Sequence, residues 1–132
     1  MAGSVVDVLE QVGIQPSAQR VAVADYVLEA EDHPSAEQVW ARVKQRFPML
    51  SRATVYNTLN LFVEKGLLRQ LALTGGHTVF DPKTARHHHL IDEATGRIYD
   101  VDWDAIRVTD AEQLPGFFVR DYQVVLRGRR ND

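Results

Sequence analysis

The chain has 132 residues, a formal net charge of −3 and no cysteine. This length allows one domain or two small ones, and the missing thiols exclude disulfides, thiolate-bound zinc, iron–sulfur clusters and thiol catalysis. Any metal would have to be bound by imidazole and oxygen, and binding to DNA would need a local basic patch or a dimer that concentrates positive charge.

The sequence shows no sign of a membrane or secreted protein. No stretch approaches the roughly 18 apolar residues of a membrane span. The start, Met1 to Ser4, lacks the basic and apolar regions of a secretory signal. We therefore expect a cytoplasmic protein with no membrane partner.

Four helices are predicted in the first half, because apolar residues recur there at helical spacing behind start signals. Ser35 to Gln38 matches a capping box, in which the two side chains bond the first free backbone amides. His33-Pro34 breaks the chain before it. The helices are expected over residues 4–13, 17–30, 35–48 and 51–66.

The third and fourth helices are separated only by Met49 and Leu50. Two helices joined by so tight a turn form the core of a helix-turn-helix. The aliphatic runs 67–73 and 77–81 flank Gly75-Gly76 and predict a β-hairpin. Helices followed by this hairpin predict a winged helix.

The rest of the chain predicts a second, smaller module. Residues 87–91 and 97–101 flank Thr95-Gly96 as another hairpin, residues 103–108 form a short helix, and residues 117–127 alternate as a long strand. A module of about 45 residues buries too little surface to be secure alone. We expect an obligate homodimer through residues from about 84 to 128. The fold class is thus α+β: a winged helix-turn-helix domain over residues 1–81, then a small α/β dimerisation and metal-sensing domain over residues 82–132.

Arg86-His87-His88-His89 is the most informative segment. If it is a strand, His87 and His89 point to one face and His88 to the other. Two imidazoles on one face, with carboxylates from Asp81 and Asp100, would suit a divalent metal such as iron, manganese, zinc or cobalt. The alternatives are a tag remnant, which would lie at a terminus, and a solvated polar strand.

The fourth helix carries polar side chains in its first turn, where a recognition helix reaches DNA. Arg52 and Asn57 can pair with bases, and Tyr56 can pack on a thymine methyl group or donate to a phosphate. The alternatives are an ordinary exposed first turn and a protein contact. The candidate DNA-contacting residues on this helix are Arg52, Thr54, Tyr56 and Asn57.

Several of these segments strongly resemble the ferric uptake regulator superfamily. The matching segments are His33 to Glu37, Ser51 to Leu59, Gly66 to Leu68, Phe80-Asp81 and the histidine run. The resemblance spans residues 13 to about 126, and its iron response and peroxide-sensing branches are the most similar. It implies a homodimeric repressor or activator whose metal occupancy controls binding to double-stranded operator DNA.

The resemblance also implies site residues. The regulatory ligands of the peroxide-sensing branch match His33, Asp81, His87, His89 and Asp100. Fe²⁺ or Mn²⁺ is the implied metal, with Zn²⁺ as a substitute in vitro. If Fe²⁺ is bound, peroxide is expected to oxidise a ligating histidine. Arg20 belongs to the Thr-x-x-Arg motif of the family and is a further candidate for DNA contact. The alternative within the class is a haem-responsive iron regulator that uses the His87–His89 run, in which His88 or its neighbours would be axial ligands, and His88 is a candidate haem or second-site ligand.

The chain departs from the family pattern at three places. The first cysteine pair of the usual structural zinc site falls at Asp92 and Thr95, and the second pair is missing, so we expect no structural four-cysteine zinc. Gln15 and Ser17 replace the residues of a minor-groove contact. The cysteine-containing haem motif near the N-terminus is also missing.

Two other classes of function are alternatives. A non-haem iron enzyme would use two histidines and one carboxylate, but it needs an open coordination position and a substrate pocket, for which the second module has little room. A structural winged-helix module would have no need for His33. The sequence therefore predicts a metal- or peroxide-responsive transcription regulator and no enzyme activity.

Overall fold

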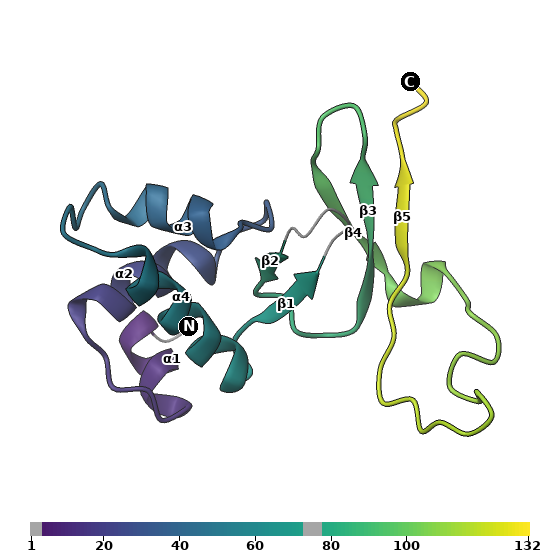
Figure 1. The fold of residues 1–132 in the computed structure, drawn as a ribbon, viewed down its shortest axis with the longest axis horizontal. Coiled ribbons are helices and arrows are strands. Elements are labelled where there is room, and N and C mark those ends of the chain that lie inside the picture. Colours follow the sequence, from purple (N-terminus) through teal and green to yellow (C-terminus); the bar gives the residue numbers. More distant parts are fainter. Residues whose placement is uncertain (1–3, 73–77) are drawn as a thin grey trace. The chain divides into compact units, whose positions relative to one another are not determined.

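A computed structural model describes residues 4–72 and 78–132, which form two compact units, Met1–Thr84 and Ala85–Asp132 (Figure 1). The first contains the helices and a two-stranded sheet, and the second contains a three-stranded sheet. The elements are α1 (Val5–Gln11), α2 (Ala18–Val27), α3 (Ala36–Val43), α4 (Arg52–Glu64), β1 (Arg69–Ala72), β2 (Thr78–Asp81), β3 (His87–Asp92), β4 (Ile98–Asp102), the 3₁₀ turn η1 (Trp103–Ala105) and β5 (Val125–Gly128).

Each of the four helices begins after a serine whose hydroxyl accepts a hydrogen bond from the backbone amide three residues later. This arrangement satisfies one of the free amides at each helix start. At α3 the reciprocal bond from the amide of Ser35 to the side chain of Gln38 is also present, so the predicted capping box is confirmed. The helices α2 and α3 end at Val27 and Val43, earlier than predicted. No helix among the described residues is long and apolar enough to cross a membrane.

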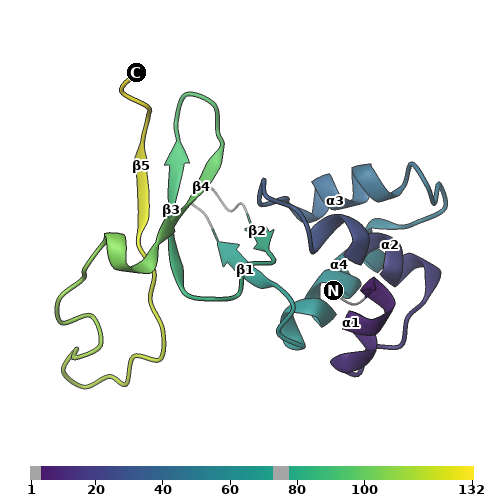
Figure 2. The ribbon, with the colours of Figure 1, turned by 180° about the vertical axis from the view of Figure 1, so that it is seen from behind.

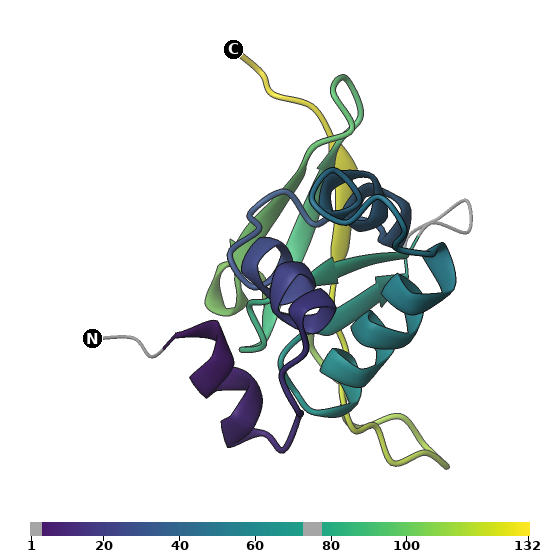
Figure 3. The ribbon, with the colours of Figure 1, turned by 90° about the vertical axis from the view of Figure 1, so that its left-hand side faces the viewer.

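The helices of the first unit enclose its hydrophobic core, and Figure 3 looks onto them. The core comes from the apolar faces that the sequence predicts. Burying one such side chain contributes about 1.5–3 kcal/mol. Its fully buried members are Leu9, Val23, Ala24, Val27, Val39, Val55, Leu59 and Phe62.

The strands β1 and β2 pair antiparallel, with Arg69 opposite Asp81 and Ala72 opposite Thr78. The predicted Gly75-Gly76 turn between them lies outside the described residues. Four helices followed by this pair of strands form a winged helix, as predicted. Because Asp81 is the last residue of β2, the wing places it at the end of the first unit.

In the second unit the strand order is β4-β3-β5 (Figure 2). The strands β3 and β4 form the predicted hairpin, with His89 opposite Asp100, and β5 runs parallel to β3, with Val125 beside His89. A parallel strand needs a long connection, and residues 106–124 provide it.

Two predictions for this unit need correction. The long strand predicted over residues 117–127 is wrong for residues 117–124, because only Val125–Gly128 is strand. By the register, Gln123 lies level with His87, the first residue of β3, so the residues before it have no strand to pair with. The helix predicted over residues 103–108 is a single 3₁₀ turn, Trp103–Ala105.

Candidate metal centre

The first unit holds two of the predicted ligands close together. The Nε2 atom of His33 lies 3.2 Å from Oδ2 of Asp81, and both side chains are about 95% buried. A backbone hydrogen bond of 2.9 Å from Phe80 N to Pro34 O ties the residues next to them together. The other carboxylate oxygen of Asp81 accepts the amide of Lys83 at 2.9 Å. Hydrogen bonds from the backbone amides before and after Asp81 therefore hold its carboxylate beside the imidazole of His33.

His33 has an unusual backbone. Its φ is +53°, one of two positive values outside glycine in the described residues. This left-handed region is costly for residues with a Cβ atom, although histidine enters it more often than most. Such strain persists where the surrounding structure demands it and is more common at functional sites.

The second unit holds the other three predicted ligands. As alternation along β3 predicts, His87 and His89 share one face, with ring centroids 4.6 Å apart. Asp100 lies opposite His89 on β4. Its Oδ1 atom is 3.3 Å from Nε2 of His87 and 3.6 Å from Nε2 of His89. One carboxylate oxygen thus faces two imidazole nitrogens.

The position of the proton on His87 is fixed by the backbone. Its Nδ1 atom lies 2.6 Å from the carbonyl oxygen of Ala85. A carbonyl only accepts, so Nδ1 carries a proton, and in the neutral ring Nε2 carries the lone pair. That lone pair is directed at Oδ1 of Asp100. Two acceptors at this separation are held together by a cation, which is either a proton or a metal ion.

His89 has a partner that was not predicted from the sequence. The Nδ1 atom of His89 lies 3.0 Å from Oε1 of Gln123, which is 34 residues further along the chain. No local signal could identify Gln123, because it lies outside the histidine run and inside what was predicted as a regular strand.

These donors fit a divalent metal of the borderline class. Imidazole nitrogen with carboxylate oxygen suits Fe²⁺, Mn²⁺ and Zn²⁺, and the chain has no thiolate to favour softer ions. The second unit supplies two nitrogens and one carboxylate, and the first supplies one of each. Ligating histidines usually donate their other ring N–H to a backbone or side-chain oxygen, as His87 does to Ala85.

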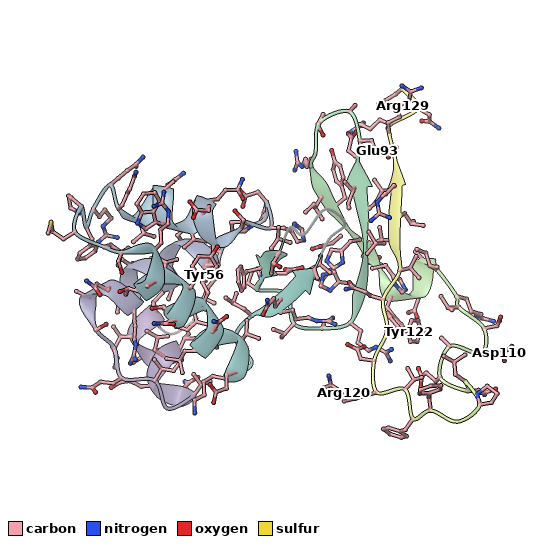
Figure 4. The ribbon with its side chains drawn as sticks, in the orientation of Figure 1. Tyr56, Glu93, Asp110, Arg120, Tyr122 and Arg129 are labelled. Atoms are coloured by element: carbon pink, nitrogen blue, oxygen red, sulfur yellow. The ribbon has the colours of Figure 1, made fainter. Side chains whose placement is uncertain are left out.

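His88 faces the other side of the sheet. Its ring is fully buried and stacks on Trp103, with centroids 4.5 Å apart and an angle of 16°. Its Nδ1 atom accepts the amide of Val124 at 2.9 Å, which joins β3 to the chain entering β5. The ring of Tyr122, which is labelled in Figure 4, lies 4.8 Å from that of Trp103. This packing gives His88 a structural role. The group of possible metal ligands among the described residues does not include His88, so the prediction that it binds haem or a second ion is not supported.

The predicted DNA-contacting residues divide into two groups. Tyr56 and Asn57 are exposed on α4, and Tyr56 is labelled in Figure 4. Tyr56 also lines a hollow of about 490 Å³ together with Gln70 of β1 and Thr78 of β2. The helix α4 and both strands of the wing therefore border one surface.

The other predicted DNA contacts are engaged within the protein. The guanidinium of Arg52 lies 3.0 Å from a carboxylate oxygen of Glu37 and 4.1 Å from the ring centre of Trp40. The hydroxyl of Thr54 lies 2.9 Å from that of Ser51, the cap of α4. Arg20 donates to the carbonyl of Gln15 at 3.0 Å. The link between Arg52 and Glu37 was not foreseen, since 15 residues separate the two.

Where the resemblance places the first cysteine pair, the chain has a hydrogen-bonded turn. Asp92 is buried, and its Oδ1 atom accepts the amide of Ala94 at 2.9 Å, while the hydroxyl of Thr95 accepts that of Arg97 at 3.1 Å. Gly96 has a φ of +78° and donates to the carbonyl of Asp92 at 2.7 Å. The hairpin between β3 and β4 is therefore closed by side-chain and backbone bonds.

A winged helix joined to a small sheet unit with imidazole and carboxylate donors defines a metal-responsive regulator of transcription. Residues 11–127 match the model of the ferric uptake regulator family, so the chain belongs to this family. Its members regulate transcription, and the chain is not an enzyme. The resemblance of the sequence to this family is thereby confirmed.

The chain is also similar to individual regulators. The chain is 31% identical to the peroxide operon regulator of Bacillus subtilis (strain 168) over 124 residues, which cover 92% of this chain and 86% of the relative. Among solved structures, a zinc-bound manganese uptake regulator is 25% identical, with a TM-score of 0.71 and coverage of 97% of this chain and 99% of that one. The ferric uptake regulator of Pseudomonas aeruginosa with manganese is 28% identical, with a TM-score of 0.69 and coverage of 96% and 97%.

Proposed function

We propose that the protein is a homodimeric transcription regulator that binds operator DNA under the control of Fe²⁺ or Mn²⁺. The observation that carries this proposal is the contact between His87 and Asp100. The carbonyl of Ala85 fixes the proton of His87 on Nδ1, so the ring directs a lone pair at a carboxylate oxygen 3.3 Å away. This arrangement is complementary to a cation, and the same chain carries a winged helix.

The proposed ligand set joins donors from both units on one ion. Each of its five members offers one ligand atom: His33, Asp81, His87, His89 and Asp100. Only five residues separate Asp81 from His87. Six steps of extended chain span at most about 20 Å, so the linker keeps the two donor sets within reach of each other. The second unit offers three protein ligands and the first offers two, so an ion bound by both units would have five.

Control of DNA binding would follow from this division of ligands. An ion shifts an equilibrium between two states only when it binds one of them more tightly. An ion that takes ligands from both units would favour the arrangement in which all of them reach it. His33 and Asp81 belong to the unit that carries α4, so metal occupancy would bear on how that helix meets DNA.

Peroxide sensitivity is proposed from a relative, and the dimer interface is proposed from exposed apolar side chains. Likeness to a peroxide operon regulator supports peroxide sensitivity of the Fe²⁺ form. We propose that dimerisation uses the second unit, where Phe117, Phe118 and Leu126 are exposed on the connection and β5. Such a regulator would act in the cytoplasm, where its operator lies.

The experiment is a DNA-binding titration with and without metal. Duplexes are first selected from a random pool with the Mn²⁺-loaded protein, and fluorescence anisotropy then gives the affinity with Mn²⁺ and with chelator. We expect the two affinities to differ by tenfold or more, which is about 1.4 kcal/mol. The difference should vanish in His87→Ala and persist in Asp104→Asn, which alters an exposed carboxylate near β4. Equal affinities with metal and with chelator would contradict the proposal.

A further inference from the structure

The C-terminal end of the connection between η1 and β5 contacts β3, and the side chain of Gln123 there meets the imidazole of His89. The amide of Val124 donates to His88, and the amide of His89 donates to the carbonyl of Val124 at 3.1 Å. These two bonds fix the backbone next to Gln123 against β3. Val125 is paired with His89, and side chains two residues apart share a face. Gln123 therefore projects on the face that carries His87 and His89.

We propose that Gln123 is the positioning residue of the metal ligand His89. Its amide oxygen lies 3.0 Å from Nδ1 of His89, where it accepts the ring proton. With the proton on Nδ1, the lone pair of the neutral ring is on Nε2, the atom that faces Asp100. Gln123 thus holds His89 in the tautomer that a metal ion needs. The proposal rests on the proposed metal site for its effect on affinity, but the tautomer itself is a property of the metal-free protein.

The two histidines differ in how firmly this tautomer is set. The partner of His87 is a backbone carbonyl, which no substitution removes. The partner of His89 is a side-chain amide, so one substitution removes it. Without an acceptor at Nδ1, the proton of His89 can move to Nε2, where Oδ1 of Asp100 accepts it. A metal ion would then have to displace that proton before His89 could bind.

The first test is made without metal. Long-range ¹⁵N NMR of the full-length, metal-free protein reports which ring nitrogen of each histidine carries the proton. We expect the proton of His89 on Nδ1 in the parent protein and a shift of population toward Nε2 in Gln123→Leu, which keeps the bulk and removes the acceptor. His87 should keep its proton on Nδ1 in both proteins and serves as the internal reference. A parent protein with the proton of His89 on Nε2 would overturn the proposal.

The second test measures Zn²⁺ affinity by competition with a chromophoric chelator. When a ligating histidine loses the group that hydrogen-bonds its other ring nitrogen, metal affinity typically falls 10- to 100-fold. We expect a fall of this size in Gln123→Leu. Gln123→Glu keeps an acceptor and should bind Zn²⁺ at least as tightly as the parent. Gln113→Leu, the same change at an exposed site of the same unit, should have no effect. Parent-like affinity in Gln123→Leu would overturn the proposal.

A third comparison separates this proposal from the proposed metal site. In a His89→Ala background, Gln123→Leu should cause no further loss, because Gln123 acts through the imidazole. An equal further loss would show that it acts elsewhere and would overturn the proposal. If His89→Ala itself binds Zn²⁺ like the parent, the assignment of His89 as a ligand fails. The metal-free NMR result would then still decide whether Gln123 sets the tautomer.

Discussion

His33 and Asp81 form a buried pair inside the winged-helix unit, with Nε2 of the imidazole 3.2 Å from Oδ2 of the carboxylate. The two residues lie 48 positions apart, on the connection between α2 and α3 and at the end of β2. Without metal, a proton on Nε2 can join them. A bound ion would take the place of that proton and use both atoms as ligands.

The backbone conformation of His33 predicts that two substitutions differ in stability although both remove the metal ligand. At a φ of +53°, the Cβ atom of an alanine makes the backbone conformation unfavourable, whereas glycine adopts it freely. We expect His33→Gly to be more stable than His33→Ala by about 1 kcal/mol, measured by urea unfolding of the metal-free proteins. Both variants should lose the effect of metal on DNA binding. Equal stabilities would show that this segment relaxes when the imidazole is removed.

Asp100→Asn should change stability and metal binding in opposite directions. The Nδ1 proton of His87 is bonded to the carbonyl of Ala85, so the neutral ring turns the lone pair of Nε2 toward Oδ1 of Asp100. An asparagine amide can donate to that lone pair, which should stabilise the metal-free protein by about 1 kcal/mol. The same change removes an anionic ligand and should remove the rise in melting temperature that Mn²⁺ causes. Asp104→Asn is the matched control, and a destabilised metal-free Asp100→Asn protein would count against the proposed proton positions.

The exposed first turns of α4 should provide sequence specificity. We expect Tyr56→Ala and Asn57→Ala each to weaken binding to the selected duplex by about 1–3 kcal/mol, with little change on unrelated DNA. Metal content and dimerisation should stay as in the parent. Gln45→Ala, which truncates an exposed side chain after α3, is the control. If both variants bind the selected duplex like the parent, another surface reads the sequence.

The pairing of Arg52 with Glu37 predicts a substitution that strengthens DNA binding. The guanidinium is neutralised by a carboxylate 3.0 Å away and stacks on Trp40. In Glu37→Gln this charge becomes available to a phosphate, so DNA affinity should rise by up to about tenfold and the salt slope by about one. Glu10→Gln makes the same change of charge on α1. Subtracting its effect on DNA affinity leaves the part that comes from the release of Arg52. Weaker binding by Glu37→Gln would mean that Glu37 orients Arg52 for DNA.

Features set by neighbouring residues could be predicted from the sequence. The capping box of α3 depends on residues three apart, and the structure confirms it. The other three predicted helices also begin next to a serine that caps them. The placement of His87 and His89 on one face follows from the geometry of any strand. The assignment of the five metal ligands from the resemblance remains a prediction.

Features that depend on distant pairing could not be predicted. The aromatic and β-branched residues over 117–127 favour a strand, but only the last part of this segment finds a neighbouring strand, so the rest is irregular. The contacts of Gln123 with His89 and of Arg52 with Glu37 span 34 and 15 residues, and neither leaves a local pattern. Knowing them requires the register of β5 and the crossing of α3 with α4.

The central claim is that one ion takes ligands from both units, and NMR of the ¹¹³Cd²⁺-loaded protein with ¹⁵N-labelled histidine tests it most directly. A one-bond coupling between cadmium and a ring nitrogen identifies each ligating imidazole. We expect couplings at Nε2 of His33, His87 and His89, all to a single cadmium resonance, and none at His88, whose Nδ1 is bonded to Val124. Couplings at His87 and His89 without one at His33 would contradict the account, because the ion would then belong to the second unit alone.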